Sequence, residues 1–116
     1  MSSLLQHYVE AFNKKDLEGV GALFEDPNRA IAHGSDGKGP VGNATSDVLR
    51  FLGPGRLALG KLNGEEVVVG VFAHETGGLA RVGFGRLAGE RDGKIVQIFW
   101  DNDATLAWKA ELVRTS

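Results

Sequence analysis

Residues 79–101 read LARVGFGRLAGERDGKIVQIFWD, and this stretch decides the fold. Its Asp92-Gly93 pair stands between two runs rich in β-branched and aromatic residues, which predicts a hairpin with a two-residue turn. Side chains alternate between the two faces of a strand. On the returning strand we therefore expect one face with Val96, Ile98, Trp100 and Asn102, and an opposite face with Ile95, Gln97, Phe99 and Asp101.

Both faces of that returning strand are apolar at the centre, so both need a cover. Antiparallel sheets commonly leave one face to water, and the helices expected in the rest of the chain can cover only the inner face. An uncovered outer face would be a large apolar patch for a monomer. We therefore expect a homodimer that forms through Ile95, Gln97 and Phe99.

Composition and charge describe one soluble globular domain that spans residues 1–116. The chain has 42% hydrophobic and 24% charged residues, a net charge of −2 and no cysteine. Without a dense Lys/Arg run, no nucleic-acid partner is expected. No apolar run approaches the roughly 20 residues that span a membrane, and the first residues lack a signal-peptide pattern. We expect a cytoplasmic protein.

The first half of the chain shows helical spacing of apolar residues. One stripe begins at Leu4 behind a serine cap at Ser2 or Ser3, and Asp16 can cap a second short helix. Residues 30–33 are expected to form a strand. A third helix is expected over about 41–52, ended by the Gly53-Pro54-Gly55 run.

The second half shows the period of two that is typical of strands. Asn63-Gly64 predicts a hairpin between strands at 57–62 and 66–74, and the strands of residues 79–101 follow. Asp103 can cap a last short helix with Leu106 and Trp108. Helices on one face of an antiparallel sheet make an α+β domain.

The two ends of the chain resemble the nuclear transport factor 2-like superfamily, in particular its SnoaL-like and ketosteroid-isomerase-like branch. The resemblance is carried by 8–13 (YVEAFN), 16–20 (DLEGV) and Leu23-Phe24 at the start, and by 92–96 (DGKIV) with Trp100-Asp101 at the end. It implies a cone, in which a strongly bent sheet wraps the first helix and a pocket opens at the mouth. Members include isomerases, polyketide cyclases and binding domains without chemistry, so the resemblance fixes the pocket and not the reaction.

The catalytic residues of the ketosteroid isomerases are only partly matched. Tyr8 corresponds to the tyrosine of their oxyanion hole. Ala32 or His33, depending on the strand register, stands where the base carboxylate would be, and Gly85 stands where the oxyanion aspartate would be. Steroid isomerisation by that mechanism is therefore not expected.

Several residues are candidates for a site at the mouth of the cone. His33 could act as a general base near neutral pH, with Tyr8 as a hydrogen-bond donor; a loop histidine and a core tyrosine are the alternatives. Trp100 is expected as a pocket wall. The other candidates for substrate binding are Asn102, Phe72, His74, Arg81 and Gly85, although His74 and Arg81 could instead belong to a solvated turn.

The small residues of the inner face bear on the ligand. If Gly70, Gly83 and Gly85 point inward, the pocket is wide and apolar, which suits a flat hydrophobic small molecule. The three histidines lack metal-ligand spacing and the Gly-rich runs lack the setting of phosphate loops, so no metal and no cofactor is expected.

Two functions remain open at this point. The first is a SnoaL-like enzyme of the isomerase or cyclase type that transfers a proton on an apolar carbonyl substrate through His33 and Tyr8. The second is a hydrophobic ligand-binding or dimeric assembly module without chemistry. The missing carboxylates favour the second function, whereas the presence of Tyr8 and His33 favours the first.

Overall fold

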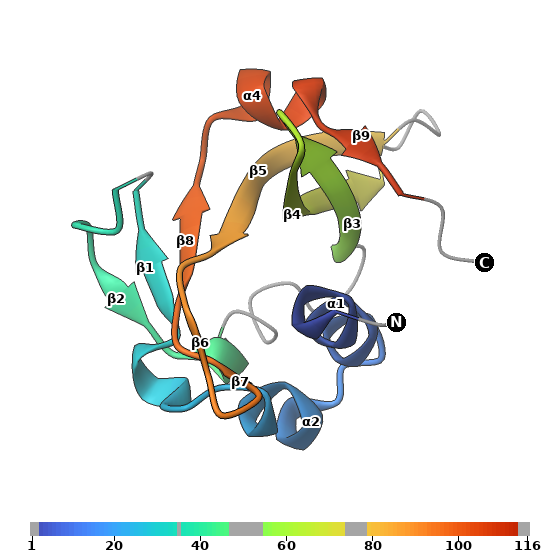
Figure 1. Cartoon of the computed structure of the whole chain (residues 1–116). Coiled ribbons are helices and arrows are strands. Elements are labelled where there is room, and N and C mark those ends of the chain that lie inside the picture. Colours follow the sequence, from blue (N-terminus) through green and yellow to red (C-terminus); the bar gives the residue numbers. More distant parts are fainter. Residues whose placement is uncertain (1–2, 35, 47–54, 74–78, 114–116) are drawn as a thin grey trace.

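The computed structural model describes residues 3–34, 36–46, 55–73 and 79–113. Seven strands form one sheet in the order β2-β1-β8-β5-β4-β3-β9, and a separate pair, β6-β7, closes the last hairpin. The sheet curls around helix α1, Leu4–Asn13 (Figure 1). The strands are β1 (Ile31–His33), β2 (Val41–Gly42), β3 (Arg56–Leu62), β4 (Glu65–Ala73), β5 (Leu79–Leu87), β6 (Glu90–Arg91), β7 (Lys94–Ile95), β8 (Ile98–Asp101) and β9 (Glu111–Leu112).

Helix α1 fills the concave face of the sheet. Ser3 caps it by accepting a hydrogen bond from the backbone N–H of Gln6 at 3.0 Å. The apolar stripe of the helix lies in a buried cluster with residues of β1, β3, β4, β7 and β8. Helix α2 (Leu17–Ala22) follows, capped by Asp16, and a 3-10 turn, η1 (Pro27–Arg29), leads into β1. The first two helices and their caps are thus confirmed.

The end of α1 also closes part of a sheet edge. The Asn13 side chain donates from Nδ2 to the carbonyl of Leu57 and accepts from the Leu57 N–H at Oδ1, both at 2.8 Å. The edge strand β9 pairs with β3 only at Gly60 and Lys61. Asn13 therefore replaces a neighbouring strand where β9 does not reach.

The sheet is mixed, whereas we expected an antiparallel one. β1 pairs with β8 in parallel, with Ile31 opposite Ile98 and His33 opposite Trp100. The ladders β3-β4, β4-β5 and β5-β8 are antiparallel, as expected for residues 57–101. The parallel pair arises because β1 reaches β8 after the two helices rather than through a hairpin.

The expected helix over 41–52 is wrong at its start. Val41 and Gly42 form β2, which pairs with β1. The helix begins at Ala44, where the Asn43 side chain accepts hydrogen bonds from the N–H groups of Thr45 and Ser46. Residues 47–52 lie outside the described part. None of the described helices is long and apolar enough to cross a membrane.

The last hairpin has the expected turn but a different distribution of side chains. Asp92 and Gly93 adopt positive φ angles of 54° and 77°, as a two-residue turn of this type requires. The expected position of Ile95 on the outer face is wrong, because Ile95 is fully buried in the same cluster as Ile98. The ladder is irregular between them, where Gly89 has a φ of 153° and lies opposite Val96. Strict alternation therefore does not hold there.

The convex face of the sheet is covered by the chain itself. Helix α4 (Ala104–Lys109) lies on this face, across the sheet from α1 (Figure 1). Ala107 and Ala110 pack there in a second buried cluster, whose sheet residues are Val67, Val69, Val71 and Phe84. The expectation that the chain can cover only one face is wrong.

The strip proposed for dimerisation is not a continuous exposed surface. Ile95 is in the core. The Gln97 side chain donates to the Arg29 carbonyl at 3.1 Å. A Cβ on Gly37 would lie 2.4 Å from the ring of Phe99, so the loop at Gly37 packs directly on that ring. Homodimerisation stays a prediction, now without this strip as its interface.

Candidate functional site

Trp100 is the central side chain on the concave face of β8. A Cβ on Gly70 or Gly83 would lie 3.0 or 3.1 Å from its indole, and a Cβ on Gly85 would also lie at 3.1 Å. The three glycines thus make room for the indole itself. The three glycines point inward, as expected, and the ring occupies the space that their missing side chains leave. The width of the pocket stays a prediction.

Packing and one hydrogen bond fix the orientation of the Trp100 indole. Trp100 is half-buried and packs against the cluster that contains α1. Its Nε1–H donates to Oδ1 of the exposed Asn102 at 2.7 Å. Trp100 and Asn102, both expected at the site, are therefore in direct contact.

His33 lies on the same face as Trp100. Directly paired residues of neighbouring strands point to the same side, and His33 pairs with Trp100 whereas Ala32 pairs with Phe99. The strand register that the sequence left open thus places His33 on the concave face and Ala32 on the convex one. The His33 side chain is half-buried, with Nε2 3.9 Å from the position of a Cβ on Gly42.

Phe72 also belongs to the concave face. Val68 packs with α1 and Gly70 faces Trp100, so Phe72, two residues further along β4, points to the same side. Phe72 is half-buried. We call Trp100, Phe72, His33 and Asn102 the concave aromatic patch.

Tyr8 lies deeper, in the core. Its side chain is 3% exposed and its ring meets those of Phe12 and Phe24 edge to face, at 5.9 and 5.6 Å between centroids. Neither Tyr8 nor His33 is among the residues that line the three cavities described below. That the two candidate catalytic side chains share a cavity stays a prediction.

The remaining candidates lie elsewhere. Arg81 is on the convex face, where Nη1 donates to the carbonyls of Ala107 and Ala110 at 2.9 and 2.8 Å. Its guanidinium lies 4.7 Å from the ring centroid of Trp108. Arg81 therefore holds α4 and does not face the concave aromatic patch. Gly85 is buried beneath Trp100, and His74 lies outside the described residues.

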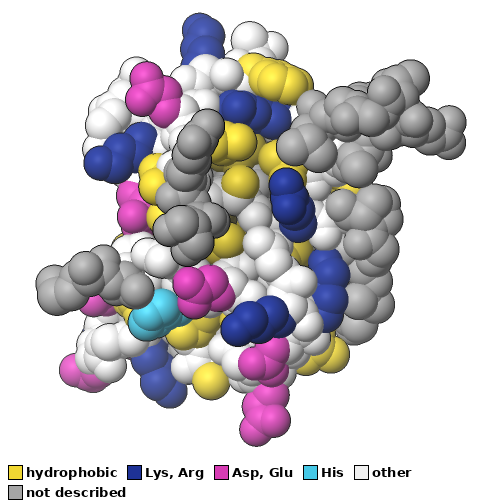
Figure 2. Space-filling view, turned by 90° about the vertical axis from the view of Figure 1, so that its right-hand side faces the viewer, with side chains coloured by type: hydrophobic (Ala, Val, Ile, Leu, Met, Phe, Trp, Pro, Cys, Tyr) yellow, Lys and Arg dark blue, Asp and Glu magenta, His cyan; other side chains and the backbone are white. Residues whose placement is uncertain are grey.

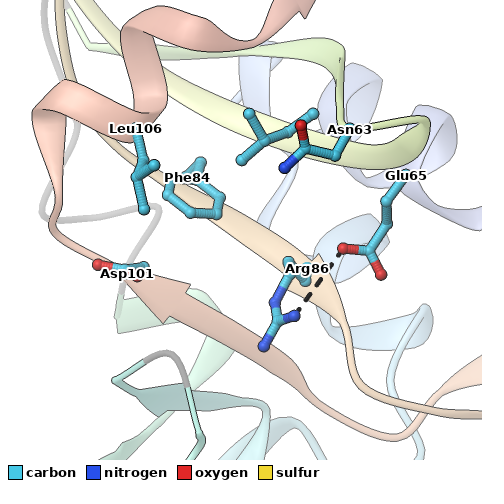
Figure 3. Close-up of a pocket in the computed structure, with 7 residues that line it drawn as sticks. Asn63, Glu65, Phe84, Arg86, Asp101 and Leu106 are labelled. Carbon is cyan, nitrogen blue, oxygen red and sulfur yellow. Dashed lines mark ion pairs between the residues drawn. The ribbon is translucent and has the colours of Figure 1, made fainter.

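A cavity on the convex face was not expected from the sequence. It has a volume of about 300 Å³ and lies between the β3-β4 turn, β5, β8 and α4 (Figure 3). Arg86 reaches toward Glu65 across it, with Nη1 3.9 Å from Oε1. Its lining residues are Leu62, Asn63, Glu65, Phe84, Arg86, Asp101 and Leu106. Strand alternation put Asp101 on the outer face, but only the fold brings Leu62 and Leu106 beside it.

Two further cavities are lined by described residues. One, of about 370 Å³, lies between α1 and β3 and includes Val9, Arg56 and Leu112. The other, of about 190 Å³, lies beside η1. Figure 2 shows the face that carries α1 and the β3-β9 edge, where hydrophobic, basic and acidic side chains are interspersed. Among the described residues, no three His, Asp or Glu side chains gather as a metal site would require.

No protein-family model matches the chain, and no curated protein matches its sequence. Solved structures do match. An NTF2-like protein of unknown function from Burkholderia pseudomallei is 24% identical with a TM-score of 0.51, and the match covers 90% of this chain and 94% of that one. TerC, co-crystallized with polyporic acid, is 23% identical with a TM-score of 0.55, and the match covers 90% of this chain and 92% of TerC.

Proposed function

We propose, from the nuclear transport factor 2-like fold that this chain has, that it is a binding module for a flat, apolar small molecule. The binding surface is the concave aromatic patch. The observation that carries this proposal is the position of Trp100, which is half-buried over three glycines with its N–H held by Asn102.

A fixed, half-buried indole favours the binding of a flat ligand. Aromatic side chains offer a large apolar surface, and two rings stack with little additional loss of conformational freedom when one is already held in place. Phe72 adds a second aromatic ring to the same face. Small-molecule sites typically combine such apolar walls with a few polar groups that orient the ligand.

The polar groups of the patch indicate what else the ligand carries. They are the His33 imidazole and the Asn102 amide, and the patch holds no Lys, Arg, Asp or Glu. A ligand with an uncharged hydroxyl or carbonyl group on an aromatic body fits this set. TerC, of similar fold, was crystallised with polyporic acid, which supports a ligand role for this fold.

Proton transfer by His33 and Tyr8 has weaker support. General acid–base catalysis requires both groups within hydrogen-bond reach of the substrate, directly or through one water. Tyr8 is only 3% exposed and its ring contacts those of Phe12 and Phe24, so little of its side chain is accessible to a substrate. The binding function therefore takes precedence over an isomerase or cyclase activity.

The proposal can be tested with 2-naphthol as the probe. In a ¹H–¹⁵N spectrum the two tryptophans of the chain give two indole N–H signals. We expect 2-naphthol to shift the Trp100 signal in a saturable way and to leave that of Trp108 unchanged. Phe72→Ala should weaken binding about tenfold, the cost of losing aromatic surface worth about 1.5 kcal/mol.

Trp108→Phe is the matched control, because Trp108 is 56% exposed on α4 and lies outside the patch. This variant should bind the probe with unchanged affinity. Unchanged affinity in Phe72→Ala, or a saturable shift at Trp108 alone, would refute the concave patch as the binding surface.

A further inference from the structure

We infer that the convex cavity beside α4 is a second binding site, specific for a small organic cation with an apolar body. The site lies on the opposite face of the sheet from the concave aromatic patch. It is independent of the function proposed above.

The apolar part of the cavity comes from three elements. Phe84 on β5 is 4% exposed and lies next to Leu106 of α4 (Figure 3). Leu62, at the end of β3, packs against the same buried cluster. These side chains give the cavity an apolar wall. Its volume of about 300 Å³ is at the lower end of the range found for small-molecule sites.

The charged part of the cavity has an excess of carboxylate. Glu65 and Asp101 line it together with one guanidinium, that of Arg86. Arg86 Nη1 lies 3.9 Å from Glu65 Oε1, so that the two charges are oriented toward each other (Figure 3). The cation of the cavity is therefore already directed at one of its two anions.

Asp101 is left without a cation. It is half-buried and directly opposite Phe84 in the β5-β8 ladder. Its Oδ1 accepts a hydrogen bond from the Asp103 N–H at 2.9 Å. Among the described residues, the ion pairs are Arg86–Glu65 and Arg91–Glu25, and neither includes Asp101. Partial burial of a carboxylate without a counter-charge is unfavourable, and a bound cation would remove that cost.

Each property of the cavity selects the same ligand class. An anion would face two carboxylates, and a neutral apolar molecule would leave Asp101 without a counter-charge. An ammonium group can pair with Asp101 while the attached apolar body contacts Phe84, Leu62 and Leu106. The Phe84 ring adds attraction for a cation near its face.

Phenethylamine, a cation at neutral pH, is the probe for this site, and 2-phenylethanol is its uncharged analogue. Calorimetric titration of the full chain should show binding of the amine at least about tenfold tighter than that of the alcohol, since the alcohol carries no positive charge to pair with the Asp101 carboxylate. 3-Phenylpropionate, an anion with a similar body, should bind more weakly than either.

Asp101→Asn is the decisive variant. The amide keeps the size of the side chain and the acceptor for Asp103 N–H but removes the charge, so we expect a loss of at least about tenfold in amine affinity. Asp92→Asn makes the same chemical change on the exposed β6-β7 turn and should have no effect. Arg86→Met should not weaken amine binding, because it removes a like charge.

The concave patch provides an independent control. Phe72→Ala should leave amine binding unchanged, so a failure of either site can be recognised without reference to the other. Equal affinities for phenethylamine and 2-phenylethanol would overturn the inference. So would unchanged amine affinity in a folded Asp101→Asn protein, or no detectable binding of the amine to the unsubstituted chain.

Discussion

Trp100 determines which residues the neighbouring strands can carry. Its indole lies against three glycines on β4 and β5, and at Gly83 an added Cβ would also lie 2.6 Å from the Asp101 carbonyl oxygen. Glycine weakens a strand interior, where it has no side chain to pack. Here that loss is offset because the glycines allow a large aromatic ring to lie flat on the sheet.

This explanation predicts opposite effects for two Gly→Ala substitutions. Gly83→Ala should lower the free energy of unfolding by about 1–3 kcal/mol or more, because its methyl group meets both backbone and indole. Gly21→Ala in α2 should raise it by about 0.5–1 kcal/mol, because alanine favours the helix. The nearest atom to its Cβ there is Thr45 Cγ2 at 3.9 Å, an ordinary packing distance.

Urea unfolding of both variants, followed by circular dichroism, measures the two changes. Gly70→Ala is an intermediate case, because its nearest neighbours are the side chains of Trp100 and Val82 rather than backbone. Gly70→Ala should therefore lower the free energy of unfolding by less than Gly83→Ala does. Equal stability of Gly83→Ala and Gly21→Ala would contradict the close packing of Trp100.

At the scale of elements, α4 depends on a residue far from it in sequence. The helix has six residues, which is too few for stability on its own. Arg81 donates to two carbonyls at its C-terminal end and lies over Trp108. A cation at this end is also favourable for the helix dipole. One side chain of β5 thus helps to hold the cover of the convex face.

Arg81→Met should therefore release α4 more than it destabilises the sheet. We expect the free energy of unfolding to fall by about 1.5–3 kcal/mol, which is typical for the loss of hydrogen bonds to a charged group. Hydrogen exchange should accelerate for the amides of residues 106–110, with a smaller change at Val68 in β4. Similar acceleration at both places would mean that Arg81 acts on global stability alone.

Arg91→Met is the matched control for that substitution. Arg91 pairs with Glu25 at 3.0 Å, but its side chain is 65% exposed. Exposed ion pairs contribute about 0–1 kcal/mol. Exchange in α4 should therefore be unaffected in this variant.

At the scale of the whole molecule, β4 joins the two buried clusters. Val68 packs on the concave side with α1, whereas Val67 and Val69 pack on the convex side with α4. All three are fully buried. Because one strand supplies both clusters, we expect the domain to unfold as a single cooperative unit.

Val69→Ala tests this coupling. The substitution should lower the free energy of unfolding by about 2 kcal/mol, because two buried methyl groups are lost and a cavity remains. In a Trp108→Phe background, the urea midpoint reported by Trp100 fluorescence should fall as much as the midpoint from circular dichroism. Val113→Ala, at a side chain that is 41% exposed, should change the free energy of unfolding by less than about 0.5 kcal/mol and so leave both midpoints nearly unchanged. Separate transitions would show that the two faces unfold independently.

The candidate site was only partly determined by the sequence. The expectation that Trp100 and Asn102 lie together depended on a spacing of two along one chain segment, and the structure places them in contact. The side of the sheet on which His33 lies follows from the pairing of β1 with β8, and no local sequence pattern encodes that pairing. Arg81 was assigned to substrate binding, but the register shift near Gly70 and Val71 and the docking of α4 place it on the convex face.

The sequence by itself determined the elements whose signals are local. Apolar spacing with the Ser3 and Asp16 caps specified the first two helices, and Asp92-Gly93 specified the last turn, because these depend on side chains within a few residues of one another. The resemblance of the two ends of the chain further indicated the cone, which the fold confirms.

Only the tertiary structure decided which surfaces are covered and where space remains. The indole over the glycines, the Asn13 amide on the edge of β3 and α4 on the convex valines all join residues distant in sequence. Such contacts depend on the curvature of the sheet and the register of its strands, which alternation along a single strand does not specify. For the same reason the sequence could not reveal the cavity that places Asp101 beside Phe84 and Leu106.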